Sequence, residues 1–131
     1  MNDCIFCKIV QGTIPCTKIA DTKNNFAFLD INPASKGHTL VIPKKHSRNA
    51  RDLPEWQELM VIATRIGNTA MEHLGAEGFN LIMSNELAAG QEVFHAHMHV
   101  LPRYANDGIR LWPPKRRLVD AKEIAEKLRL H

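Results

Sequence analysis

Three histidines alternate with apolar residues in the segment His95-Ala96-His97-Met98-His99. On a β-strand the three imidazoles would share one face, about 7 Å apart, while Ala96 and Met98 would face the core. Each ring carries polar nitrogens that need partners, so three rings on one face are a poor way to build an apolar core. The row therefore predicts a functional site.

Two kinds of chemistry fit such a row. Three histidines can bind a catalytic zinc ion and leave one position open for water. Alternatively, one imidazole can act as a nucleophile while the others serve as hydrogen-bonding partners, because imidazole titrates near neutral pH. The row by itself leaves both interpretations open.

The three cysteines offer a second chemical feature. Cys4 and Cys7 form a Cys-x-x-Cys pair, which alone is compatible with redox chemistry, metal binding or coincidence. Cys16 has no evident partner, and an odd number of cysteines without a secretion signal argues against a disulfide framework. A structural zinc site would need two further ligands beyond this pair.

The surrounding pattern predicts one α+β domain, which suits a chain of 131 residues. Apolar residues at helical spacing indicate one long helix from Pro54 to Leu74, and Ile5–Val10 indicates a short helical turn. We expect strands at Thr17–Asp21, Asn25–Asp30, His38–Ile42, Phe79–Met83 and Phe94–Leu101, with Pro102 ending the last one. The last two strands are expected to be adjacent and antiparallel, in a sheet crossed by the long helix.

Composition and charge exclude few functions. With 17 Lys and Arg against 14 Asp and Glu, the formal charge of +3 is mild and does not indicate nucleic-acid binding. The N-terminus lacks a signal-peptide pattern and no long apolar run occurs, so we expect a cytoplasmic protein without a membrane segment. Val119–Leu130 carries a weak helical pattern, and the basic run Lys115–Arg117 is typical of a solvated face.

Further segments occur in a specific order around the histidine row. Gly90–Phe94 leads into the row, and Gly37–His46 and Phe28–Pro33 lie upstream. Together they resemble the histidine triad (HIT) family of nucleotide hydrolases and transferases, and Trp112-Pro113-Pro114 is similar to the C-terminal segment of its nucleoside phosphoramidase branch. The resemblance covers about residues 4–114 and implies a HIT-like fold for a domain at residues 1–114. Residues 115–131 match nothing in the family, and we expect them to form a basic, helical extension of the same domain.

The resemblance also implies a mechanism. His97 matches the nucleophile, which would attack the α-phosphorus and form a nucleotidyl-histidine intermediate that water hydrolyses. His38 matches the position that supports it, while His99 and Gln91 match groups that contact the phosphoryl oxygens. Position 92 departs from the pattern, because Glu92 stands where phosphoramidases commonly carry a serine that protonates the leaving group. A carboxyl group could do this only with a raised pKa, which leaves leaving-group preference open.

The resemblance further implies a nucleoside pocket. Asp30 matches the carboxylate that accepts hydrogen bonds from the ribose hydroxyls, and Asn85 is a further candidate phosphate contact. Trp112 would reach the neighbouring subunit's site in a homodimer. The residues that match the apolar base pocket are Phe6, Ile9, Phe28 and Ile31. Without the resemblance, Phe28 and Ile31 would be ordinary core residues.

A metal-binding subset of the superfamily, including galactose-1-phosphate uridylyltransferase, has ligands at positions that correspond to His46 and His95. The resemblance thus implies a closed, structural zinc site made of Cys4, Cys7, His46 and His95. The alternative is two thiols on a flexible N-terminus, with His95 hydrogen-bonded within the triad.

The leading hypothesis is a homodimeric hydrolase that cleaves a purine nucleoside phosphoramidate or related nucleotide at the α-phosphate. Dinucleoside polyphosphates are alternative substrates, since His97 could serve either reaction. Two rival hypotheses are a zinc hydrolase that uses the three row histidines as ligands and a non-catalytic nucleotide-binding module.

Overall fold

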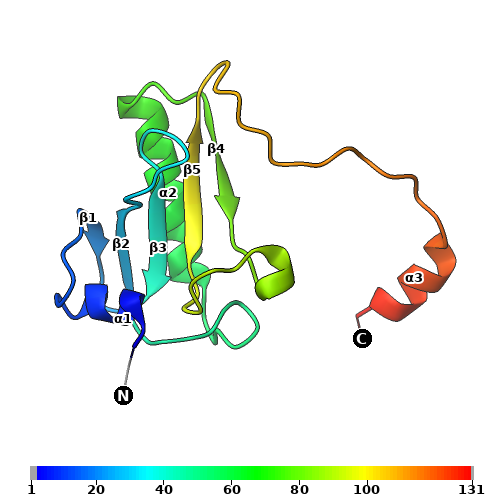
Figure 1. The fold of residues 1–131 in the computed structure, drawn as a ribbon, viewed down its shortest axis with the longest axis horizontal. Helices are drawn as coiled ribbons and strands as arrows, with labels where there is room; N and C mark the ends of the chain where they lie inside the picture. Colours follow the sequence, from blue (N-terminus) through cyan, green and yellow to red (C-terminus); the bar gives the residue numbers. More distant parts are fainter. Residues whose placement is uncertain (1–2, 131) are drawn as a thin grey trace.

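The computed structural model describes residues 3–130 (Figure 1). Residues 1–2 of the predicted domain (1–114) and residue 131 of the predicted extension (115–131) lie outside the described residues. Five strands form an antiparallel sheet in the order β1-β2-β3-β5-β4. The strands are β1 (Lys18–Asp21), β2 (Asn25–Leu29), β3 (Thr39–Pro43), β4 (Gly78–Ile82) and β5 (Met98–Arg103). The helices are α1 (Ile5–Val10), α2 (Gln57–His73) and α3 (Ala121–Leu128), with a short 3-10 helix η1 (Leu87–Ala89).

Alternation along the strands divides the core between the two faces of the sheet. Ala27, Val41, Met98 and Val100 form one buried cluster with residues of α2. The residues between them point to the opposite face, where α1 packs. A second buried cluster lies on this face and contains Phe6, Ile9, Phe26, Phe28, Leu40 and Ile42. The α+β class, the single long helix and the short N-terminal helix are therefore confirmed, and the α1 face is the one that carries His99.

The long helix begins later than predicted, at Gln57 rather than in the turn that follows Pro54. Its first turn is fastened to the β1–β2 hairpin, because Glu58 accepts hydrogen bonds from Thr22 (2.6 Å) and Asn25 (2.7 Å). The helix ends at His73, and Gly75 then turns the chain with a φ of 78° that glycine adopts without cost. The helix packs across β3, β5 and the edge strand β4.

The prediction of a strand at Phe94–Leu101 is wrong in its register, since β5 covers Met98–Arg103. His95 and His97 precede the strand because the backbone there bonds to another loop, with the Ala96 amide donating to the Ser47 carbonyl (2.7 Å). Pro102 lies within β5 rather than ending it. The β3–β5 pairing stops at Val100, so the missing amide hydrogen of Pro102 costs no ladder bond with β3.

The C-terminal region departs from the sheet as an extended arm and ends in α3, which stands apart from the body in Figure 1. The helix falls within the predicted Val119–Leu130 segment. Trp112, Leu118 and Leu128 are exposed along this region. Within residues 3–130, the helices are too short or too polar to cross a bilayer.

Candidate active site and metal centre

Two clusters of chemically capable side chains lie next to each other on the α1 side of the sheet. His38, which precedes β3, contacts His99 and lies beside Asp30, and the other neighbour of the His99 ring is His97. His95, two residues before His97, turns instead toward Cys4, Cys7 and His46. The three row histidines thus lie close to one another but belong to two centres, His97 and His99 to the first and His95 to the second.

The hydrogen bonds of His97 determine which of its nitrogens can react. Its Nδ1 lies 2.8 Å from the carbonyl oxygen of His95, and a carbonyl can only accept, so the proton resides on Nδ1. The other nitrogen, Nε2, then carries an available lone pair. Burial lowers the pKa of His97, although the His95 carbonyl and Asp30 oppose this effect. The ring is therefore neutral at pH 7, as a nucleophile requires.

A second chain of hydrogen bonds fixes the tautomers of His38 and His99. The backbone amide of Ala34 donates to Nδ1 of His38 (3.0 Å), so the proton of His38 resides on Nε2. That Nε2 donates to Nδ1 of His99 at 2.9 Å. Nε2 of His99 must then carry a proton, and it can donate that proton to an anionic oxygen.

Burial also keeps these two rings neutral. It lowers the pKa of His38, with the charge of Asp30 acting in the opposite direction. Burial, together with the neighbouring His97 and His38, lowers the pKa of His99 to about 4. Three adjacent imidazoles could not all be charged in one partly buried space, so the neutral relay is the consistent state at pH 7.

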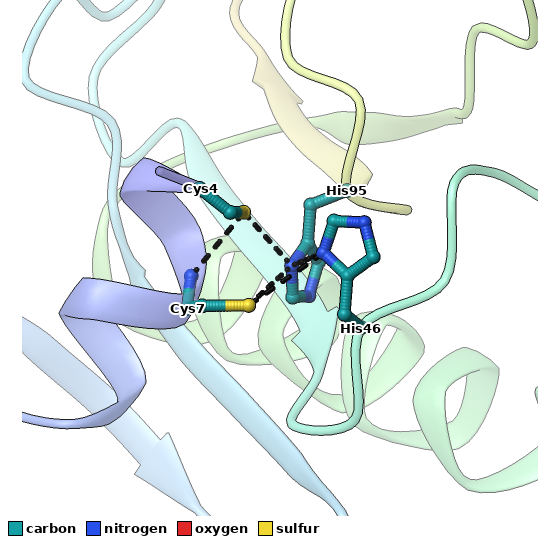
Figure 2. Close-up of side chains that lie close together, drawn as sticks. All are labelled: Cys4, Cys7, His46 and His95. Carbon is teal, nitrogen blue, oxygen red and sulfur yellow. Dashed lines mark hydrogen bonds between the residues drawn. The ribbon is translucent and has the colours of Figure 1, made fainter. Parts of the chain in front are cut away.

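The second cluster has the composition and dimensions of a zinc site (Figure 2). Nδ1 of His95 lies 3.3 Å from the Cys4 sulfur, 3.5 Å from the Cys7 sulfur and 3.2 Å from Nδ1 of His46. The Cys7 sulfur is 3.6 Å from Nδ1 of His46. A tetrahedral zinc with ordinary bond lengths requires S···N edges of about 3.6 Å and N···N edges of about 3.3 Å. The four side chains therefore fit this ion with small adjustments.

The remaining bond of His95 supports the same conclusion. Its Nε2 lies 2.7 Å from the Pro43 carbonyl oxygen, which places the proton there and leaves Nδ1 as a lone pair facing the cysteines. A backbone carbonyl that orients a histidine in this way is typical of metal ligands. His95 is fully buried. Because its carbonyl also bonds Nδ1 of His97, the metal centre and the His97 site share this residue.

Asp30, His38 and His99 also bring possible ligand atoms within 4.8 Å of one another. Hydrogen bonding argues against a metal there, because the Ala34 amide requires the proton of His38 to sit on the nitrogen that would bind the ion. Nδ1 of His97 is likewise occupied by the His95 carbonyl. This arrangement disfavours the rival hypothesis in which the three row histidines bind one catalytic zinc.

The residues predicted for the base pocket divide into two groups. Phe6, Ile9 and Phe28 are buried in one cluster, and the Phe6 ring lies edge-on to His97 with centroids 5.1 Å apart. Ile31 is 87% exposed in the loop before His38. Asp30 is half-buried beside His38, with one oxygen accepting from the Asn32 amide (2.9 Å) and the other 3.6 Å from Nε2 of His38. An apolar surface, a carboxylate and a neutral imidazole thus adjoin one another.

Gln91 and Asn85 are engaged differently from the phosphate donors that were expected. Gln91 is buried, and its amide nitrogen donates to the carbonyls of Arg48 (2.7 Å) and Val93 (3.1 Å). The Asn85 oxygen accepts from the Ala50 amide (2.8 Å). Both side chains therefore hold loops together in this conformation, with the hydrogens of Gln91 already used.

Sequence reasoning missed the residues that hold these loops. Arg48, Asn49 and Arg51 all contact Glu86, which lies next to Asn85. Nothing in their spacing signals this network, because it joins two loops that lie far apart in the chain. Glu92 is exposed, and Trp112 is 82% exposed on the arm.

An apolar hollow lies away from these residues. A cavity of about 440 Å³ lies between α2 and the β1–β2 side of the sheet, and its lining includes Ile19, Ile62 and Leu74. None of the histidine or cysteine ligands lines it. The candidate site is thus defined by its polar groups and its buried aromatic surface.

Comparison with known proteins identifies the family. The model of the HIT domain matches residues 11–106, which include both His38 and the histidine row. The chain belongs to the HIT family. An uncharacterised HIT-like protein of Methanocaldococcus jannaschii is 40% identical over 128 residues, covering 96% of this chain and 98% of its own. Adenosine 5'-monophosphoramidase hnt1 of Schizosaccharomyces pombe is 43% identical over 100 residues, covering 76% of this chain and 74% of its own.

Solved structures share the HIT fold of this protein. A Streptococcus mutans protein superposes with a TM-score of 0.87 at 43% identity, covering 97% of this chain and 82% of that one. A zinc-bound histidine triad protein of Mycobacterium smegmatis superposes with a TM-score of 0.79 at 38% identity, covering 95% of this chain and 88% of that one. HIT proteins therefore include a relative named for phosphoramidase activity and a relative named for bound zinc.

Proposed function

We propose that this HIT protein hydrolyses a purine nucleoside phosphoramidate at its α-phosphate, with His97 as the nucleophile. The observation that carries the proposal is the 2.8 Å bond between Nδ1 of His97 and the His95 carbonyl. It leaves Nε2 unprotonated in a buried ring whose pKa is lowered by desolvation. The name of the fission yeast relative supports adenosine monophosphoramidates as the substrate class.

The reaction would proceed in two displacements. Nε2 of His97 attacks the α-phosphorus, the P–N bond breaks, and the amine leaves with the bonding electron pair and a proton from solvent. The His95 carbonyl stabilises the positive charge that develops on the imidazole. Water then attacks phosphorus, returns a proton to solvent and releases AMP as the bond to Nε2 breaks. The sum is phosphoramidate plus water giving AMP and amine.

His99 and His38 would act on the charge that develops during each displacement. Nε2–H of His99 would donate to a phosphoryl oxygen, since His38 holds the proton of His99 on that nitrogen. A donor aimed in advance at a developing anion stabilises the transition state without reorganisation. Phe6, Ile9 and Phe28 would cover the base and Asp30 would accept from the ribose hydroxyls, whereas exposed Ile31 would close over the base only when nucleotide binds.

The zinc site would serve structure rather than chemistry. Cys4 at the N-cap of α1 and Cys7 within α1 would supply thiolates, and His46 and His95 would supply imidazoles from the loops that follow β3 and precede β5, so four protein ligands would complete the ion's shell. The bound ion would supply a cross-link between α1 and the loop that carries His97. The zinc-bound relative from M. smegmatis supports this assignment.

We also propose a homodimer in which the C-terminal arm crosses to a second copy. Ile124 and Leu128 lie on one side of α3 and are exposed, as expected of a helix whose apolar face has a partner elsewhere. The likeness to the S. mutans structure spans 97% of this chain and therefore extends into the arm. Trp112 would then lie near the partner's nucleotide site.

The decisive experiment compares the parent protein with His97→Ala. Both are incubated with adenosine 5'-phosphoramidate and, separately, with diadenosine tetraphosphate, and AMP release and zinc content are measured. We expect the parent to release AMP from the phosphoramidate and the variant to lose at least about a thousandfold in rate, with zinc equal in both. Zinc lost with His97 would favour a metallohydrolase. Binding without AMP release from either substrate would favour a nucleotide-binding module, and preference for the tetraphosphate would favour a polyphosphate hydrolase.

A further inference from the structure

Glu86 has a backbone conformation that L-residues rarely adopt. Its φ of 77° and ψ of 162° fall in a region populated almost entirely by glycine. Asn106 and Asp120 also have positive φ, but the φ of 54° and ψ of 34° at Asp120 are left-handed helical values that such residues tolerate. The strain at Glu86 is therefore of a different kind, and it lies in the loop that leads to the histidine row.

The side chains of four residues hydrogen-bond to Glu86 in this conformation. Its carboxylate accepts from Nη2 of Arg48 (2.9 Å), Nη1 of Arg51 (3.2 Å) and Nδ2 of Asn49 (2.9 Å). Its backbone amide donates to Oε1 of Gln91 at 2.9 Å. The bonds from Arg48 and Asn49 lower the pKa of Glu86 to about 2, so the carboxylate is charged throughout the neutral range.

These contacts join two loops on either side of the metal centre and the nucleophile. We call Arg48, Asn49, Arg51, Glu86 and Gln91 the clasp. The first three follow the candidate zinc ligand His46, while Glu86 and Gln91 precede His95 and His97. The loops are joined further by Gln91 to the Arg48 carbonyl (2.7 Å) and by the Ala96 amide to the Ser47 carbonyl (2.7 Å).

We propose that Glu86 is a positioning residue for the nucleophile: its charged clasp holds a strained loop so that the His97 segment stays in its reactive arrangement. The proposal rests on the function proposed above. Glu86 contacts neither His97 nor His99 and acts through Gln91 and the Ser47–Ala96 link.

Stability alone does not account for this arrangement. Arg48 and Arg51 are more than half exposed, at 54% and 75%, so their ion pairs contribute little to folding, and the bond from buried Asn49 contributes most of the hold on the carboxylate. Glycine would adopt the same backbone with far less strain. Glutamate at this position is thus less favourable for stability than glycine, but its carboxylate accepts hydrogen bonds from three residues of the facing loop.

Three substitutions separate strain from positioning. Glu86→Gly removes both the strain and the carboxylate, Glu86→Ala keeps the strain without the carboxylate, and Glu86→Gln keeps an acceptor for Asn49 and one arginine. We expect Glu86→Ala to melt about 3 to 8 °C below Glu86→Gly. Glu55→Gly serves as the matched control, because it removes an exposed carboxylate outside the clasp and is expected to keep parental kcat.

The kinetic result decides the proposal. Adenosine 5'-phosphoramidate is the substrate, and Glu86→Gly is expected to lose about tenfold or more in kcat with KM changed less than about threefold, since Phe6 and Asp30 lie outside the clasp. Glu86→Gln is expected to recover part of the loss. Parental kcat in Glu86→Gly would overturn the proposal, and so would a fall in kcat that merely parallels unfolding.

A parent protein that releases no AMP would instead refute the proposed function. The positioning role is then judged from the ring N–H signal of His97 in ¹⁵N-labelled protein, which reports the bond to the His95 carbonyl. A shifted or lost signal in Glu86→Gly, with the Glu55→Gly signal unchanged, would support the clasp. An unchanged signal in Glu86→Gly would overturn it.

Discussion

The His38 side chain makes two hydrogen bonds, one accepted from the Ala34 amide and one donated to His99, and substitutions can separate their effects. His38→Asn keeps an oxygen near the position of Nδ1, where it can accept from the Ala34 amide, but it removes the donor that faces His99. His38→Ala removes both groups. We therefore expect His38→Asn to fall mainly in activity and His38→Ala to fall in activity and stability.

The size of the activity loss follows from the tautomer of His99. One neutral hydrogen bond contributes about 1 kcal/mol, so its loss changes the tautomer ratio of His99 about fivefold. Because His99 can still adopt the productive tautomer part of the time, kcat/KM should fall only about two- to fivefold in His38→Asn. His99→Ala removes the donor entirely and should cost about 100- to 1000-fold, as the loss of an oxyanion donor does.

Stability provides the second readout. His38→Ala removes the acceptor of the amide of Ala34, an exposed residue, which should cost about 0.5–1.5 kcal/mol beyond His38→Asn. AMP release from adenosine 5'-phosphoramidate measures the first effect, and urea unfolding measures the second. Parental activity in His38→Asn, or a loss as large as that of His99→Ala, would refute the relay.

Two further predictions concern protons and metal. Because burial lowers the pKa of His97, kcat/KM should stay level from pH 8 to 6.5. An imidazole with an unperturbed pKa would lose about tenfold in kcat/KM by pH 5.5, and we expect the loss here to be smaller. Below pH 6.5 the unfolded chain binds more protons than the folded one, so the free energy of unfolding should decline as the pH falls. A pH–rate profile tests the first expectation, and melting curves across the same pH range test the second. Cys7→Ser should lose most bound zinc and melt several degrees lower, whereas Cys16→Ser should keep both values, as measured by metal analysis and calorimetry. Equal zinc content in Cys7→Ser and the parent would exclude Cys7 as a ligand.

The sequence predicted the fold well because its signals are periodic. The helical spacing of α2 and the β-branched, apolar run of β3 are local patterns that tertiary contacts did not override. The register of β5 was wrong for a physical reason: alternation continues through His95, but the Ser47 carbonyl bonds the Ala96 amide and draws the chain out of the sheet. A contact with a distant loop leaves no trace in the spacing of the row.

The same limit applies to the site. Cys4, Cys7, His46 and His95 were predicted as one metal centre and do converge in the structure. The strain at Glu86 and the engagement of Gln91 could not be predicted, because both depend on donors supplied by Arg48 and Asn49 from another loop. Residue types reveal which groups can do chemistry, but the hydrogens they have available depend on tertiary partners.

The double role of His95 connects the two centres and bears on the choice between the two chemistries. Its ring presents Nδ1 to the cysteines while its carbonyl accepts the Nδ1 proton of His97, so one residue would serve both the proposed metal and the proposed nucleophile. If a single zinc ion were to bind both rings, His97 would have to give up this carbonyl or turn Nε2 away from substrate. A structural metal leaves Nε2 of His97 available, and zinc can then stabilise the position of the nucleophile without contacting the phosphate.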